Sequence, residues 1–419
     1  MPTASAPRRS AFRWLGPGLI MAAAGIGASD IVSATVGGAT HGLALLWALA
    51  LGAFLKFVLS EGITRWQLAT GSTVMEGWAQ HLPRWVLAVF GAYLLLWAVA
   101  VTGALTNGSG LAIENLTGGA VPRSWGALAH CLVAFGFIYS AHAGGFARVM
   151  KPLMVLMFVA IVLCATLTFS EPVAMLKGLV IPAIPKGAGA YVLSLVGGIG
   201  GSVTLLAYSY LLKEEEGERP SLWAVRADLG IAYLFTAVFG LSVMLIANRV
   251  FFAAGVQISD ADAVSRMADQ LAHLIGPAGR LVYSFGFWAA VVASLFGVWQ
   301  SVPFMIADCY ALLRRLPEPE RASLVRAGSL PYRAALTLMA LSSIPFAFAG
   351  RPLLVIVAFT VLGSLFIPFL AATLLYLNNR IPFPAHVPRN HVMSNVVLVF
   401  VLALFLVVGG REIASIVSR

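Results

Sequence analysis

The feature that most constrains the fold of this chain is a series of apolar segments, each about 20 residues or longer, the length a helix needs to cross a bilayer. Hydrophobic residues make up 60% of the 419 residues and charged residues only 11%. Most of the folded surface must therefore face lipid rather than water. The sequence predicts about eleven spans, at 15–40, 43–66, 84–112, 124–142, 149–170, 189–212, 222–248, 279–312, 331–349, 351–377 and 391–410.

The formal net charge of +10 does not come from a basic patch. Lys and Arg are scattered singly through the connections between apolar segments, so we interpret them as topology signals and expect no nucleic-acid partner. With the N-terminus in the cytoplasm, the inner connections hold most of these residues, which favours a bacterial-type inner (plasma) membrane protein with that orientation. The cysteines and histidines lack the spacing of a disulfide framework or zinc site.

Glycines interrupt two of the predicted spans near their middle. In the first span, Gly25 and Gly27 precede Asp30 within AAGIGASDIVSATVGG, and in the sixth span four glycines fall within SLVGGIGG. Unwound backbone in lipid leaves amide and carbonyl groups unpaired, at several kcal/mol each, unless they line a cavity or hold a ligand. The pattern predicts two discontinuous helices around a binding site near the bilayer midplane.

The two breaks occupy equivalent places in two halves of five spans each. An odd number of spans per half gives the halves opposite orientations, which is typical of inverted-repeat secondary transporters. We therefore expect one membrane domain with a cytoplasmic tail at 1–14, a first repeat at 15–170, a second repeat at 189–377 and a further span at 391–410.

The segment LGPGLIMAAAGIGASD resembles the first span of the NRAMP-type divalent-metal transporters. Similar stretches are LLWALALGAFLKFVLSEGITRWQLATG in span two, GGIGGSVTLLAYSY in span six and FIPFLAATLLYLNNR at the end of span ten. The resemblance implies an all-α integral membrane protein with a LeuT-like 5+5 inverted repeat and broken helices 1 and 6. It also implies secondary transport of a small cation, above all a divalent metal ion, by alternating access, with no enzymatic activity.

The chain departs from that family at the metal site. NRAMP transporters are known for an Asp-Pro-Gly-Asn break in span one and a Met-Pro-His break in span six. Alignment on GPGL places the first motif on 27–30, and alignment on GGIGGSV places the second on 204–206. The aspartate therefore becomes Gly27, the asparagine becomes Asp30 and the methionine becomes Thr204, so the soft thioether ligand is lost.

An oxygen-rich site is predicted in its place. A charged side chain at mid-membrane costs about 2.5–3.5 kcal/mol on insertion scales and persists mainly where it pairs or faces a cavity. Carboxylate, hydroxyl and carbonyl oxygens suit Mg²⁺, Mn²⁺, Ca²⁺ or Na⁺. We expect Asp30 and Thr204 to contact a divalent cation that is bound as substrate, with no cofactor. The predicted substrate-binding set is Gly27, Ser29, Asp30, Gly201, Ser202 and Thr204.

Lys56 is a second charge at mid-membrane, about halfway along span two. It could neutralise the acid of span one, replace a coupling ion, contact an anionic substrate or extend to the membrane surface. Glu61 and Arg65 have the spacing of an ion pair on a helix. In span eight, either Gln300 or Asp308 could face the central cavity.

Other functions stay open on sequence alone. The chain could transport another small solute, such as an amino acid, an amine or a monovalent ion, because a fold does not fix a substrate. It could also be a membrane receptor that binds without transport. An intramembrane aspartyl enzyme would need a second aspartate opposite Asp30, for which only Asp308 is available. No GxxxxGK[ST] motif supports ATP-driven pumping.

Overall fold

The computed structural model describes residues 16–140, 143–214, 220–256, 263–349, 352–384 and 387–417, so the predicted tail at 1–14 lies outside them. The described residues form helices and no strand. Seven helical segments among them are long and apolar enough to cross a membrane, judged by length and composition. The helices in the predicted spans are α1 (Pro17–Gly25) with α2 (Ala28–His41), α3 (Leu46–Thr70), α5 (Arg84–Leu116), α6 (Arg123–Ser140), α7 (Ala143–Thr168), α9 (Gly189–Gly198) with α10 (Ala207–Glu214), α11 (Leu222–Ala247), α13 (Pro277–Leu313), α15 (Leu330–Ala347), α16 (Pro352–Arg380) and α17 (Val392–Val417).

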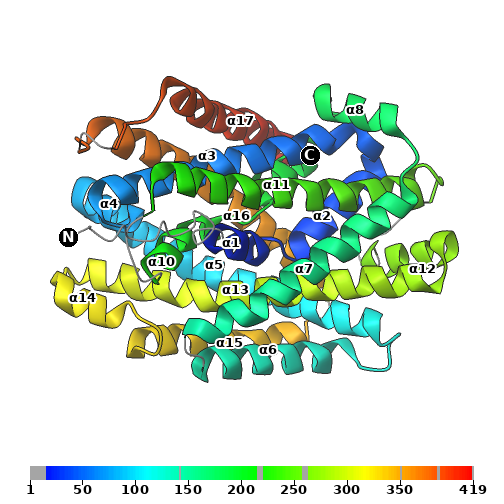
Figure 1. The fold of residues 1–419 in the computed structure, drawn as a ribbon, viewed down its shortest axis with the longest axis horizontal. Coiled ribbons are helices and arrows are strands. Elements are labelled where there is room, and N and C mark those ends of the chain that lie inside the picture. The colour runs from blue at the N-terminus through cyan, green and yellow to red at the C-terminus, as the bar shows by residue number, and fades with distance from the viewer. Residues whose placement is uncertain are drawn as a thin grey trace, which may run out of the picture.

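Short helices mark the two ends of the bundle. α4 and α14 lie at one end, and α8 and α12 lie at the other (Figure 1). We call these the α14 end and the α12 end. The distribution of Lys and Arg predicts that the α14 end faces the cytoplasm. The short elements are η2 (Gly42–Leu45), α4 (Val74–His81), α8 (Pro172–Val180), η3 (Val203–Leu206), the π-helical turn η4 (Asn248–Phe252), α12 (Ala263–Ile275) and α14 (Glu318–Leu324).

Both predicted helix breaks are present. α1 ends at Gly25 and α2 begins at Ala28, while α9 ends at Gly198 and the next helical turn begins only at Val203. In the second break, Gly200 and Gly201 have φ angles of 71° and 84°. Backbone in this left-handed region favours glycine, because a Cβ would be strained there.

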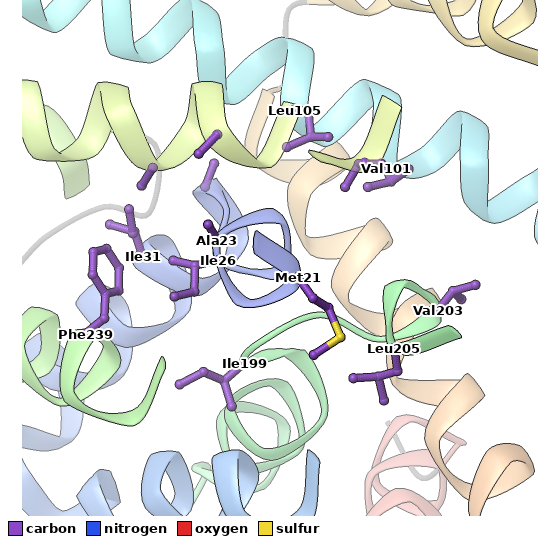
Figure 2. Packing of buried hydrophobic residues seen from close by; sticks show 14 of the residues in the cluster. Met21, Ala23, Ile26, Ile31, Val101, Leu105, Ile199, Val203, Leu205 and Phe239 are labelled. Carbon is purple, nitrogen blue, oxygen red and sulfur yellow. The ribbon is translucent and has the colours of Figure 1, made fainter. Parts of the chain in front are cut away.

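The two breaks touch each other in the middle of the bundle. A Cβ added to Gly25 would lie 2.7 Å from both the carbonyl carbon and the carbonyl oxygen of Gly200, so only glycine permits this approach. Apolar side chains surround the contact, including Ile26 from the first break, Ile199 from the second and Leu205 just beyond it (Figure 2). The breaks are therefore packed into the core rather than exposed to lipid.

The long helices pack against one another in the interior of the bundle. α3 packs against α11, and these are the second spans of the two predicted repeats. α5 packs against α13, and these are the third spans. α1 packs against both α11 and α13, which are the second and third spans of the predicted second repeat.

Candidate ion-binding site at the helix breaks

Asp30 lies in the first turn of α2 and is buried. Its Oδ2 accepts a hydrogen bond of 2.8 Å from the Gly27 amide, so the carboxylate caps the helix that follows the break. A negative charge at a helix N-terminus is favourable, because the helix dipole is positive there. The other oxygen, Oδ1, is buried and has no hydrogen-bond partner among the described residues. The backbone of Gly200 interacts electrostatically with this carboxylate, so the acid that caps the first break also faces the second.

Most of the predicted site residues line one small cavity beside the contact between the breaks. The cavity has room for about one water molecule. Thr204 contributes a buried hydroxyl oxygen that has no hydrogen-bond partner among the described residues. We call this space the central cavity. The predicted residues that line it are Gly27, Ser29, Gly201, Ser202 and Thr204.

Asp30 and Thr204 do not line the same cavity. Asp30 lines a second small cavity with Ser33 and Ser194, whose hydroxyl oxygens lie 2.9 Å apart in a hydrogen bond. Ser29 lines both cavities, so the two are neighbours. The structure therefore places the two predicted metal ligands in neighbouring cavities and not in a shared one.

Ser294 of α13 is a site residue that the sequence analysis missed. Its hydroxyl donates a hydrogen bond of 2.8 Å to the carbonyl oxygen of Ala24, in the last turn before the first break. It also lines the central cavity. A Cβ on Gly27 would lie 2.9 Å from the Ser294 hydroxyl, so Gly27 and Ser294 lie close together at the first break. No local pattern marks such a serine within an apolar span.

Lys56 is fully buried in α3 and does not extend to the membrane surface, so that alternative is wrong. Its Nζ donates a hydrogen bond of 2.9 Å to the Gly197 carbonyl oxygen and another to the Gly201 carbonyl oxygen. Its charge also interacts with that of Asp30. Lys56 therefore connects the backbone of the second break to the acid that caps the first.

A third small cavity extends from the site toward the α14 end. It shares Ala24 and Thr204 with the central cavity and continues past Gln300 and Ser301 to Tyr210. Thr204 thus lies where the two cavities meet. Of the two candidates in span eight, Gln300 faces this cavity.

Asp308, the other candidate, instead belongs to a buried ion-pair network at the α14 end. It contacts Nε of Arg321 at 2.7 Å and accepts a hydrogen bond of 2.6 Å from the Tyr210 hydroxyl. Arg321 also pairs with Glu76, which lies 3.2 Å from the ammonium of Lys213. Burial alone would raise the pKa of Glu76, but hydrogen bonds and the nearby positive charges hold this pKa below its usual value. The network ties α10 to α4, α13 and α14.

Two carboxylates hold α11 against the first and second spans. Asp228 accepts hydrogen bonds from the Gly18 amide at 2.7 Å and the Tyr208 hydroxyl at 2.9 Å, and so anchors the N-terminal end of α1. Glu61 of α3 forms the predicted ion pair with Arg65 and also pairs with Arg226 of α11 at 2.9 Å. Residues from distant spans meet in the Asp228 contacts, so no sequence pattern could reveal them.

Comparison with known proteins places the chain in a family. The family model described as natural resistance-associated macrophage protein-like (Nramp) matches residues 18–418. This chain belongs to the Nramp family. The predicted resemblance is thereby confirmed.

Several Nramp proteins are similar to this chain. The divalent metal cation transporter MntH of Chromohalobacter salexigens is 25% identical over 370 residues, which cover 83% of this chain and 84% of that protein. MntH of Erwinia tasmaniensis is 26% identical over 378 residues, 82% of this chain and 87% of that protein. Human natural resistance-associated macrophage protein 1 is 27% identical over 259 residues, 58% of this chain and 45% of that protein.

Solved structures confirm the fold class. A manganese transporter of Eremococcus coleocola, in complex with an aromatic bis-isothiourea compound, superposes with a TM-score of 0.75 at 15% identity, covering 99% of this chain and 89% of that one. MhsT in complex with L-phenylalanine superposes with a TM-score of 0.59 at 17% identity, covering 93% of this chain and 97% of that one. This Nramp protein therefore has the predicted LeuT-like fold with broken helices 1 and 6.

Carboxylate, thiol and imidazole groups do not gather at the breaks. The part of the chain that the structure describes holds no group of three or more His, Cys, Asp or Glu residues placed to bind a metal ion. Beside the carboxylate of Asp30, the described residues at the breaks offer hydroxyl groups and backbone oxygens.

Proposed function

We propose that this Nramp protein is a secondary transporter that moves a divalent metal cation across the membrane by alternating access. The observation that carries the proposal is the central cavity at the contact of the two breaks, which is lined by hydroxyl and backbone groups and has room for about one water molecule. The relatives named MntH and the manganese transporter structure support the substrate class. In the described arrangement the central cavity has no room for an amino acid or a larger amine.

The ligand set favours a hard cation. Hydroxyl, carboxylate and carbonyl oxygens suit Mg²⁺ and Mn²⁺ better than softer ions, which prefer sulfur. Thr204 supplies an unpartnered hydroxyl in the central cavity, and Asp30 supplies an unpartnered carboxylate oxygen in the neighbouring one. In our proposal the ion contacts these two residues in turn, passing Ser29 between them.

We infer that the buried ion pairs around Arg321 close the proposed path at the α14 end. In the predicted topology this end faces the cytoplasm, and the network around Arg321 lies beyond the cavity that contains Tyr210. The described arrangement thus corresponds to a state that is shut toward the cytoplasm. Alternating access then requires the buried ion pairs of this network to separate.

Uptake into proteoliposomes tests the function. The purified protein is reconstituted in vesicles that contain a dye quenched by Mn²⁺, and external Mn²⁺ is added with and without a membrane potential. Quenching that is faster than in protein-free vesicles supports transport. Binding of Mn²⁺ by calorimetry without uptake under any gradient would instead identify a receptor.

Thr204→Met is expected to change metal selectivity. The thioether would replace the unpartnered hydroxyl between the central and third cavities, and sulfur favours soft cations. We expect the ratio of Cd²⁺ to Mg²⁺ affinity, measured by calorimetry, to rise about tenfold or more. Thr166→Met, on the exposed side of α7, serves as the control and should leave the ratio unchanged. An unaltered ratio in Thr204→Met would exclude residue 204 from the site.

Arg321→Gln is expected to open the α14 end. The change leaves the buried carboxylates of Asp308 and Glu76 without their shared partner, which is strongly unfavourable in a closed network. We expect a cysteine placed at Ser301 to react with a membrane-impermeant maleimide about tenfold faster in this background. The exposed Arg326→Gln is the matched control. Equal labelling rates in the two variants would show that the network does not close the path.

A further inference from the structure

The second break creates a cation-binding position at the end of α9. The last carbonyl groups of a helix lack intrahelical partners and carry partial negative charge from the helix dipole. α9 ends at Gly198, in the middle of the protein rather than at its surface. Two carbonyl oxygens, that of Gly197 in the last turn of α9 and that of Gly201 within the break, accept hydrogen bonds from the same atom, the Nζ of Lys56.

Close packing of α3 against α9 places Lys56 beside these carbonyl groups. Gly52 lies one helical turn before Lys56, and a Cβ there would lie 2.8 Å from Cγ2 of Ile199 and 3.0 Å from the carbonyl oxygen of Leu195. The missing side chain thus lets the two helices approach. The lysine chain then runs fully buried to the freed carbonyl groups.

The surroundings of this ammonium group resemble those of a bound metal ion. Two backbone carbonyl oxygens accept hydrogen bonds from it, and the carboxyl group of Asp30 interacts with it electrostatically. Carbonyl groups of an unwound membrane helix are the groups that coordinate coupling ions such as Na⁺ in transporters with broken helices. A buried ammonium without such partners would be several kcal/mol less stable.

We propose that the ammonium group of Lys56 is a tethered cation that permanently fills an alkali-ion position in the second break. The inference rests on the proposed function in taking the chain for a transporter. The transported cation then moves past Asp30 and Thr204 with no Na⁺ or K⁺ bound at the Gly197 and Gly201 carbonyl groups. Removal of the lysine side chain opens the position to an external alkali ion.

Thermal unfolding of the Lys56→Ala variant in different salts tests this inference. The full chain is purified in detergent with a chelator, and its Tm is measured in NaCl, KCl and choline chloride at equal ionic strength. An ion that binds only the folded state stabilises it. We expect Na⁺ or K⁺ to raise the Tm of Lys56→Ala by about 2–4 °C over choline. The wild type and the exposed Lys151→Ala control should have the same Tm in all three salts.

Both possible failures are informative. A folded Lys56→Ala protein with equal Tm values in all three salts would overturn the inference, because the vacated carbonyl groups would then bind no cation. A wild-type Tm that rises in NaCl or KCl would also overturn it, since the position would already be open. If Lys56→Ala does not fold, Lys56→Ser takes its place, because a hydroxyl can still donate to one carbonyl group, and the same two outcomes apply.

The result is independent of divalent-metal transport. No divalent ion is present in the unfolding experiment and no uptake is measured. Absence of Mn²⁺ uptake by the wild type would refute the proposed function and leave the alkali-ion result intact. Conversely, uptake with no alkali-ion effect on Lys56→Ala would refute only the tethered cation.

Discussion

Asp30→Asn is expected to reduce Mn²⁺ uptake into proteoliposomes about 100-fold or more, equivalent to at least about 2.7 kcal/mol. The amide oxygen of asparagine can still accept the hydrogen bond from the Gly27 amide, so the N-terminus of α2 stays capped. The variant loses the negative charge and the unpartnered carboxylate oxygen that the buried site offers a cation. It also leaves the charge of Lys56 without its acidic counterpart.

The control for this experiment is Asp269→Asn. Asp269 forms an exposed ion pair with Arg280 at 3.0 Å and lies in α12, far along the chain from the breaks. Exposed pairs of this kind contribute little, about 0–1 kcal/mol, so uptake and Tm should match the wild type. Normal Mn²⁺ uptake by a folded Asp30→Asn protein would remove Asp30 from the path of the ion.

The sequence predicted the helices and the two breaks because both depend on local signals. Backbone in lipid must pair its own hydrogen bonds, so the length of an apolar run nearly determines a spanning helix. Gly25 and Gly27 bracket the first break, and Gly200 and Gly201 supply the left-handed backbone of the second. The apolar length of a span and the glycines at a break each act within a few residues, so the sequence alone is enough to predict them.

The interior of the site was predictable only in part. Five residues of the predicted set, all except Asp30, do line one cavity, since those residues lie at the breaks themselves. The separation of Asp30 from Thr204 depends on how one break lies against the other, which no local pattern encodes. The same holds for Ser294 and Arg321, whose partners lie far away in the sequence. Lys56 was recognised as unusual, but its two carbonyl partners required the packing of α3 on α9.

The contact between the breaks leads to the second large effect, expected for Gly25→Ala. The added methyl group would lie 2.7 Å from the carbonyl carbon and oxygen of Gly200, and both are backbone atoms that cannot rotate away. The breaks must therefore move apart, at a cost of about 1–3 kcal/mol for overpacking. Gly201 and Thr204 line the central cavity and come soon after Gly200 in the chain. A shift of Gly200 would therefore change the shape of this cavity. We expect Mn²⁺ uptake to fall about tenfold or more.

Gly136→Ala provides a matched control for this change. Gly136 lies on an exposed part of α6, and a Cβ there would meet no atom within 4 Å. Alanine is also the better helix former by about 1 kcal/mol, so this variant should transport normally with an equal or higher Tm. Gly25→Ala should show both the lower Tm and the loss of uptake. If it matched Gly136→Ala in both measurements, the direct contact of Gly25 with Gly200 would be unnecessary for transport.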